Sequence, residues 1–229
     1  DFICCKMTLE HIHDVRAFLA SIVSGLNQGP IQLFFQIPEM QRILEETAFW
    51  DIYYEHCSYF TRSSLASVFQ SVGLVVDDIW TDYDDQYLMI SASWETEVQK
   101  AKTRLSIPQE LPVLVGGFTK SLEQFRRTWN SFFVNQKREN RSIVIWGGGS
   151  KTVAFISCLG IEEFVDGVVD INPHKQGTYL AGSGHKILSA AELPAIQPDV
   201  VIIMNPIYLE EIQGLLAQYQ LSPQLKLLR

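Results

Sequence analysis

Hydrophobic residues in the first 95 positions of the chain occur in two kinds of pattern. Short continuous runs are typical of buried strands, whereas residues spaced three and four apart are typical of amphipathic helices. Pro38 ends the second run, and Gly73 stands where a glycine closes a helix. The elements predicted in this part are a strand at 2–6, a helix from Val15 to Leu26, a strand at 31–37, a helix capped by Thr61 or Ser63, and strands at 74–80 and 87–93.

Residues 95–138 show a helical pattern around a predicted loop at 108–117. The apolar stripe of the longer helix contains several aromatic residues, which are more typical of core or interdomain packing than of a base-stacking surface. Strands and helices alternate again from residue 142 onward. They are a strand at 142–146, a glycine loop, a helix ending at Leu159, strands at 165–170 and 200–204, a helix at 209–221 and a strand at 225–228.

This alternation predicts an α/β protein, and a length of 229 residues favours two domains. Residues 1–95 contain strand-helix units that end in a pair of strands, which is typical of the second half of a doubly wound sheet. We therefore expect that a first half precedes residue 1. Residues 96–140 are predicted to form a helical connector, and residues 141–229 a Rossmann-like domain.

The composition excludes several classes of partner. A formal net charge of -8 argues against nucleic acid, because affinity for nucleic acid depends on clustered Lys and Arg. The 4 cysteines lack the paired spacing of a zinc site or a disulfide framework, so we expect reduced thiols in a cytoplasmic protein. No stretch reaches the roughly 18 apolar residues that span a bilayer, so we expect no membrane partner. The oligomeric state stays open.

Three consecutive glycines separate a predicted strand from a helix that starts near Lys151. Backbone without side chains can approach a ligand closely, and the amides at a helix start favour an anion. Asp170 follows at about the distance expected of an acidic residue that binds a ribose, as in NAD-binding turns. The third glycine of that pattern is absent, because Thr152 occupies its place. A tight turn that only packs the helix against the strand is therefore an alternative.

Polar residues also follow the predicted strands at one edge of this sheet, and open α/β sheets bind ligands at the carboxyl ends of their strands. These residues are Asp170, Asn172, Lys175 and Asn205. Two functions are compatible with this pattern. One is a noncatalytic nucleotide or nucleotide-sugar binding module, and the other is an NAD-dependent oxidoreductase that uses Gly147, Gly149 and Asp170.

The segment 49–60 combines several aromatic rings with acidic residues and His56, in a predicted loop after the second strand. Histidine suits proton transfer near neutral pH, and Tyr53 or Glu55 beside it can orient it or act as acid or base. An aromatic core loop with a hydrogen-bonded histidine is the competing interpretation. Cys57 beside His56 resembles a nucleophile and its base only in composition.

Glu10, His11 and His13 follow the first predicted strand, and residues of these types can ligate a metal. The two histidines are only two positions apart, unlike the pair on one helix face in H-E-x-x-H. No metal ligand is therefore predicted in this chain.

Four separated motifs resemble those of the S-adenosylmethionine-dependent C-methyltransferases of deoxysugar biosynthesis and occur in the same order. They are CKMTLEHI at 5–12, FWDIYYEHCSYF at 49–60, IWGGGSK at 145–151 and VDINPHKQG at 169–177, and MNPIY at 204–208 is similar to a fifth. The resemblance covers essentially the whole chain. It implies an N-terminal zinc-binding segment, a central class I methyltransferase domain and a Rossmann-like C-terminal domain that helps bind a nucleotide-sugar. Residue 1 then falls at the fourth strand of the methyltransferase sheet.

The resemblance implies methyl transfer to a carbon next to the ketone of a nucleotide-linked 4-keto-deoxysugar. Removing the proton from that carbon gives an enolate, which requires a base and an oxyanion stabiliser. By motif match the resemblance favours His56 as the base, with Tyr53 and Glu55 as close partners. The motifs leave open whether His56 or Tyr53 takes the proton. His11 would hydrogen-bond the enolate oxygen.

The resemblance also assigns binding residues. Those expected to bind the substrate are Gly147, Gly149, Ser150, Lys151, Asp170, Asn172, Lys175 and Asn205, and those near the cofactor are Cys5, Lys6 and Met7. Relatives commonly carry a histidine at the position of Met7, so a contact made from that position is lost or altered here. The main cofactor loop and the zinc ligands are expected upstream of residue 1, so this chain alone is expected to bind the cofactor poorly and to be a partial, inactive enzyme.

Overall fold

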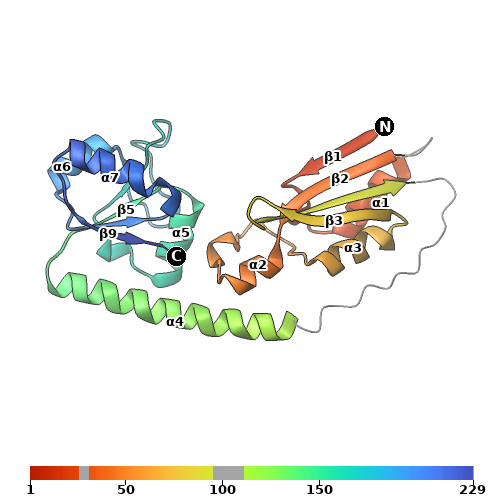
Figure 1. Cartoon of the computed structure of the whole chain (residues 1–229), viewed down its shortest axis with the longest axis horizontal. Helices are drawn as coiled ribbons and strands as arrows, with labels where there is room; N and C mark the ends of the chain where they lie inside the picture. Colours follow the sequence, from red (N-terminus) through yellow and green to blue (C-terminus); the bar gives the residue numbers. More distant parts are fainter. Residues whose placement is uncertain (26–30, 95–110, 229) are drawn as a thin grey trace. The chain divides into compact units, whose positions relative to one another are not determined.

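A computed structural model describes residues 1–25, 31–94 and 111–228 of the chain (Figure 1). The chain divides into two compact units, Asp1–Leu122 and Glu123–Arg229. Each unit is a mixed α/β structure, as the sequence predicts. Of the predicted connector at 96–140, the first part lies outside the described residues. Residues 111–138 form one helix, and the division between the two units falls within that helix.

The first unit contains a four-stranded sheet. Its strands are β1 (Phe2–Lys6), β2 (Ile31–Pro38), β3 (Val75–Asp82) and β4 (Tyr87–Trp94), in the order β1-β2-β4-β3. β1 and β2 are parallel, whereas β4 runs antiparallel to both of its neighbours. The two parallel strands end at the same edge of the sheet, which is the edge where open α/β sheets bind ligands.

The helices of this unit are α1 (Val15–Gly25), α2 (Met40–Glu45) and α3 (Arg62–Ser71), with 3-10 turns η1 (Leu9–His11) and η2 (Phe49–Asp51). Thr61 caps α3 in a capping box with Ser64, which confirms one of the two predicted caps. α1 and α3 cover one face of the sheet, where alternate residues of β2 such as Leu33 and Phe35 are fully buried. α2 was not expected from the sequence.

β1 differs from its prediction as a buried strand. Its side chains alternate between exposed and half-buried, and Phe2 is 65% exposed. The physical reason is its position, because in the described part of the chain β1 pairs only with β2 and forms an edge of the sheet. Its inward residues Ile3 and Cys5 pack against the core.

The longest helix, α4 (Leu111–Arg138), corrects the predicted loop at 108–117. Residues 108–110 lie outside the described residues, and from Leu111 onward the backbone is helical. Pro112 is accommodated because the first turn of a helix needs no hydrogen-bonded N–H at that position. The helix then continues through Gly116 and Gly117, so a glycine pair typical of a loop was misleading here.

The second unit contains a five-stranded parallel sheet. Its strands are β5 (Ile143–Trp146), β6 (Gly167–Val169), β7 (Ile187–Leu188), β8 (Val200–Ile203) and β9 (Gln224–Leu227). The order β7-β6-β5-β8-β9 reads 3-2-1-4-5 when counted from β5, which is the order of doubly wound dinucleotide-binding sheets. The strand order reverses between β5 and β8. β7 was not expected from the sequence.

The remaining helices are α5 (Ser150–Leu159), α6 (Leu193–Ile196) and α7 (Leu209–Gln218), with 3-10 turns η3 (Glu162–Phe164), η4 (Ala190–Glu192) and η5 (Pro206–Tyr208). Aromatic residues of α4 pack against Phe155 of α5, with ring centroids 4.9 Å apart for Trp129 and 6.2 Å for Phe133. This confirms that the aromatic stripe forms packing contacts, because Trp129, Phe133 and Phe155 are all buried.

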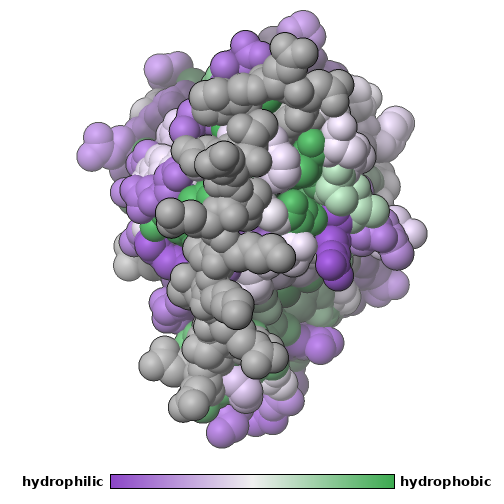
Figure 2. All heavy atoms as spheres, turned by 90° about the vertical axis from the view of Figure 1, so that its right-hand side faces the viewer, coloured by the Kyte–Doolittle hydropathy of each residue, from purple (hydrophilic) through white to green (hydrophobic). Residues whose placement is uncertain are grey.

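The described helices include none that is both long and apolar enough to cross a membrane. On the face shown in Figure 2, hydrophilic residues are interspersed with smaller groups of hydrophobic ones. Within α4 the buried residues are Trp129, Phe133 and Gln136, so its packing stripe lies in the C-terminal part of the helix.

We predict that Phe155→Ala lowers the free energy of unfolding of the second unit by about 3–5 kcal/mol, because it opens a cavity beside Trp129 and Phe133. Hydrogen exchange at the β5 amides reports this unit specifically. Val134→Ala is the matched control, since Val134 is 42% exposed on α4, the helix that carries Trp129 and Phe133. Equal protection in the two variants would contradict this account of the core.

Candidate functional site

A cavity of about 100 Å³ lies at the carboxyl ends of the parallel strands of the first unit. Its lining residues are Met7, Pro38, Arg42, Asp51, Tyr53, His56, Gln86 and Tyr87. Met7 follows β1 and Pro38 ends β2, so the cavity occupies the position where open α/β sheets bind ligands. The cavity brings together three of the predicted residues, namely Met7, Tyr53 and His56.

The loop after η2 directs Tyr53 and His56 into this cavity. The His56 amide donates to the Tyr53 carbonyl at 3.2 Å, and the two rings meet edge to face with centroids 4.8 Å apart. The Tyr53 amide donates to the Tyr59 hydroxyl at 3.1 Å, which fixes the turn from the other side. Tyr54 is 100% exposed, so neighbouring residues of this segment do face different surroundings.

His11 lies beside His56, with ring centroids 4.9 Å apart. Its Nδ1 is 3.2 Å from the Glu55 carbonyl oxygen, an oxygen that can only accept a hydrogen bond. Glu55 thus contacts His11 through its backbone, whereas its side chain is exposed. Burial and the neighbouring His11 lower the pKa of His56, which favours a neutral imidazole near neutral pH.

Arg42 and Asp51 are functional candidates that the sequence did not single out. The Arg42 guanidinium forms ion pairs with Asp51 and with Glu46 at the cavity wall. Arg42 comes from α2, a helix that no sequence pattern predicted, while Asp51 stands inside the motif at 49–60. The two carboxylates hold the guanidinium in place beside Tyr53 and His56 and neutralise its charge.

Two of the three residues expected near the cofactor, Cys5 and Lys6, do not line this cavity. Cys5 is half-buried against the core, where burial raises the pKa of its thiol, and Lys6 is exposed. Met7 adopts a left-handed backbone with φ 49°, which turns the chain sharply at the end of β1.

A second cavity, of about 260 Å³, lies in the second unit at the carboxyl ends of its strands. The residues that line it are Trp146, Gly147, Asp170, Ile171, Lys175, Ile203, Met204, Asn205, Tyr208, Glu211 and Ile212. The ends of β5 and β8 both contribute, so the cavity opens where the strand order reverses. That crevice is the expected ligand position in a doubly wound sheet.

The three glycines of the loop after β5 have different structural roles. Gly147 has φ +121°, and a Cβ there would lie 3.3 Å from Met204. A Cβ on Gly148 would lie 3.0 Å from Ile187. Gly149 has ordinary extended backbone, and its nearest neighbour would be the Lys175 Nζ at 3.9 Å. Packing inside the protein therefore explains the first two glycines, although Gly147 also lines the cavity, whereas a side chain at position 149 would meet little of the protein.

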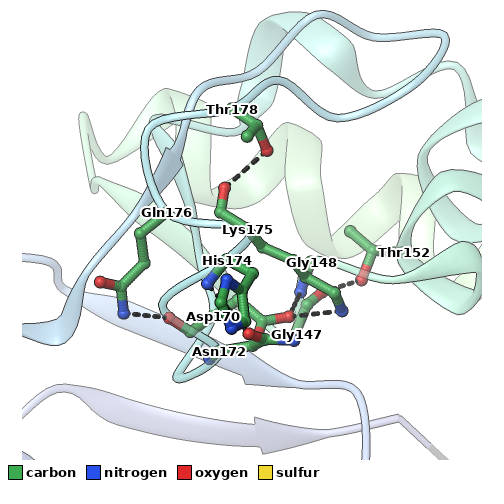
Figure 3. A network of polar contacts seen from close by, with 9 residues as sticks. All are labelled: Gly147, Gly148, Thr152, Asp170, Asn172, His174, Lys175, Gln176 and Thr178. Atoms are coloured by element: carbon green, nitrogen blue, oxygen red, sulfur yellow. Dashed lines mark hydrogen bonds and ion pairs between the residues drawn. The ribbon is translucent and has the colours of Figure 1, made fainter.

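Asp170 is the centre of a polar network that holds this loop in place (Figure 3). One carboxylate oxygen accepts from the Gly148 amide at 2.9 Å and from the Lys175 ammonium at 3.0 Å. The other accepts from the Asn172 amide at 2.9 Å. A carboxylate has about four lone-pair sites, so most of its capacity is used internally. This arrangement suits a residue that shapes the loop better than one that binds a ribose.

The other predicted binding residues of this unit are divided. Lys175 and Asn205 line the cavity, whereas Gly149, Ser150, Lys151 and Asn172 stand outside its lining. The Asn205 side chain accepts from the Ile207 amide at 3.4 Å and caps η5. Trp146 and Tyr208 line the cavity but were missed. Tyr208 belongs to the motif at 204–208, so that motif contained a signal for it.

Comparisons with known proteins relate both parts of the chain to methyltransferases. Residues 110–222 match the family model of the C-methyltransferase C-terminal domain, and residues 1–79 match that of a methyltransferase domain. Both parts of the chain are thus similar to methyltransferase families, and residues 110–222 are similar to the C-methyltransferases in particular.

One curated relative is the C-methyltransferase NovU of Streptomyces niveus, which is 25% identical over 218 residues. That alignment covers 90% of this chain and 51% of NovU, so the chain spans about half the length of this relative. Among solved structures, RSP, a Rex-family repressor, matches over 93% of this chain and 83% of its own, with a TM-score of 0.30 and 12% identity. A likeness of that size supports no argument.

We predict that Asp170 stabilises the second unit in a pH-dependent way. Burial alone would raise its pKa, but the amides of Asn172 and Gly148 and the Lys175 ammonium outweigh that effect and lower it. The stabilisation is therefore present above the unfolded pKa of about 3.9 and is lost as pH falls through the folded pKa.

Asp170→Asn should lower the free energy of unfolding at pH 7 by about 1–3 kcal/mol. The difference from the wild-type chain should shrink below about pH 4, where the carboxylate of the wild type is protonated. Protection of the β5 amides in urea provides the measurement, and Glu163→Gln, at an exposed position of the same unit, is the control. A difference that stays constant with pH would contradict the assigned role.

Proposed function

We propose that the protein containing this chain is an S-adenosylmethionine-dependent C-methyltransferase. Its proposed substrate is a nucleotide-linked 4-keto-deoxysugar, which is methylated on a carbon next to the ketone. The observation that carries the proposal is the cavity formed by Met7, Tyr53 and His56 in a chain whose two parts match methyltransferase family models. The name of the relative NovU supports the C-methyl chemistry.

The cofactor would lie next to the end of β1. Met7 is the last predicted cofactor residue, it lines the cavity, and its turn leaves the carboxyl end of the strand open. Met7 would then form one side of a binding site for S-adenosylmethionine, and Cys5 and Lys6, which lie outside the cavity, would position it through the backbone. When bound, this cofactor supplies an electrophilic methyl group on a sulfonium.

The residues of the cavity can supply the proton chemistry. A base must remove the proton on the carbon next to the ketone, and the resulting carbanion then forms the new carbon–carbon bond as the sulfur–methyl bond breaks. Tyr53 and His56 both line the cavity, and either could accept that proton, His56 as the neutral imidazole and Tyr53 as the phenolate. His11, which contacts His56, is the proposed partner of the enolate oxygen, and Glu55 orients His11 through its carbonyl group.

The second unit is proposed to hold the nucleotide part of the substrate. Gly147, Asp170, Lys175 and Asn205 line its cavity, and Gly149, Ser150 and Lys151 form the start of α5. The dipole and amides at the start of that helix favour phosphate groups, and Asn172 completes the loop beyond β6. The occupied carboxylate of Asp170 counts against the alternative of an NAD-dependent oxidoreductase.

We expect His56→Ala in the complete protein to lower kcat by about 10²–10⁴-fold, because a group that transfers or orients the proton is lost. The KM for the nucleotide-sugar should change by no more than about twofold, since the phosphates are held elsewhere. The assay follows transfer of labelled methyl to a panel of keto-sugar nucleotides. His13→Ala is the control, because His13 is exposed and lies outside the cavity. Retained turnover would remove His56 from the mechanism.

Lys151→Ala should have the opposite kinetic signature. Loss of a charged contact to phosphate is expected to raise the KM for the nucleotide-sugar about tenfold with kcat nearly unchanged. Lys120→Ala, at an exposed position of α4, serves for comparison. An unchanged KM would show that the start of α5 does not hold the phosphates.

A further inference from the structure

Glu10 is a buried acidic residue that the proposed reaction does not use. It is 1% exposed, and neither of its carboxylate oxygens has a hydrogen-bond partner within the described residues. His56 Nδ1, also buried, likewise has no partner there. An uncompensated carboxylate inside a protein costs several kcal/mol, so such groups are normally paired, protonated or bound to a cation.

The geometry brings a third donor to the same place. Glu10, His11 and His56 each offer one ligand atom, and these atoms all lie within 4.8 Å of one another. Bonds of about 2.0–2.2 Å to zinc put the ligand atoms of a tetrahedral site roughly 3.4 Å apart, so small side-chain rotations would close the cluster around an ion.

The tautomer of His11 suits a ligand. The Glu55 carbonyl can only accept, so the nitrogen 3.2 Å from it, His11 Nδ1, carries the proton. This leaves the lone pair on Nε2 of the neutral ring. A metal-bound histidine typically donates its other ring N–H to a backbone carbonyl or a carboxylate in this way.

The backbone holds the three residues together without any ion. The Glu10 carbonyl accepts from the amides of Cys57 at 2.7 Å and Ser58 at 3.2 Å. The segment after β1 and the loop that carries His56 are therefore joined at the base of the cluster. A site whose ligands are already positioned loses little conformational entropy on binding.

We propose that Glu10, His11 and His56 form a binding site for a divalent transition-metal ion, with zinc as the best-fitting ion. Two imidazoles and one carboxylate are a ligand set of catalytic zinc sites, which keep a further position open. His56 also lines the cavity, so the open position would face it. His13, the second histidine of the local sequence, is exposed and not part of the cluster.

The site goes beyond the proposed function and stands without it. For the proposed reaction it has one consequence. Coordination through Nδ1 puts the remaining proton of His56 on Nε2, so the imidazole could no longer accept a proton from the substrate. Tyr53 would then be the proton acceptor, as a phenolate that has first lost its own proton to solvent. The cation would stabilise the enolate oxygen as a Lewis acid in place of His11, whose Nε2 would be a ligand.

Binding is tested on the metal-free chain without methyl donor or sugar. Titration with Zn²⁺ by calorimetry should give one site per chain, and Co²⁺ should give a visible absorption spectrum that Zn²⁺ abolishes. Glu10→Gln and His56→Ala should each weaken binding by about 100-fold or more. His13→Ala and Cys57→Ser are the controls, because His13 lies outside the cluster and Cys57 is an exposed thiol beside it. Both should bind as the wild type does.

Absence of saturable binding to the wild-type chain would overturn the proposal, as would binding lost in Cys57→Ser but kept in Glu10→Gln. Circular dichroism establishes that each variant is folded, and if Glu10→Gln unfolds, His56→Ala decides. Because these measurements need no substrate, a failed metal site and a failed methyltransferase assay are separate results.

Discussion

The first unit depends on a pair of backbone hydrogen bonds from Cys57 and Ser58 to the Glu10 carbonyl. These bonds join the turn after β1 to the loop after η2, two segments that are far apart in the sequence. Without them His11 and His56 would belong to separate surface loops. With them the two rings touch, and the buried carboxyl group of Glu10 lies against both. Burial raises the pKa of that carboxyl group, so its protonation is sensitive to whatever neighbour it acquires. Proton transfer and cation binding at this place therefore compete for the same atoms.

In the second unit, the Asp170 carboxylate organises the ligand-binding edge. It ties the glycine loop after β5 to the loop after β6, and it also fixes the position of the Lys175 ammonium. The cavity beside it lies where the strand order reverses, so fold and local network both position ligand-binding groups at one place. The Lys175 ammonium pairs with Asp170, yet its side chain is 41% exposed. It is therefore accessible to an anion bound in the cavity.

Patterns in the sequence predicted the elements whose residues are both periodic and well capped. α3 with its Thr61 cap, and the parallel strands β5, β6 and β8, are examples, because local signals and burial agree there. The predictions were wrong where tertiary context decided. β1 is apolar but lies at an edge, and Leu111 to Gly117 are helical although Pro and Gly favour a loop. At the sites, His56 and Tyr53 could be picked out by residue type. Arg42 and the orientation of Glu10 could not, because they depend on a short unpredicted helix and on contacts between distant segments.

The insertion of β4 between β2 and β3 has a consequence for how the first unit is made. β4 is the last strand of that sheet in the chain, yet it supplies a hydrogen-bonded neighbour to both β2 and β3. During synthesis neither of those earlier strands can complete its pairing until residue 94 has left the ribosome. The sheet therefore closes late and over a long sequence separation, which slows folding and leaves one hydrogen-bonding edge of β2 open to misassociation in the meantime. A ribosome that pauses before residue 87 would hold the unit in that exposed state.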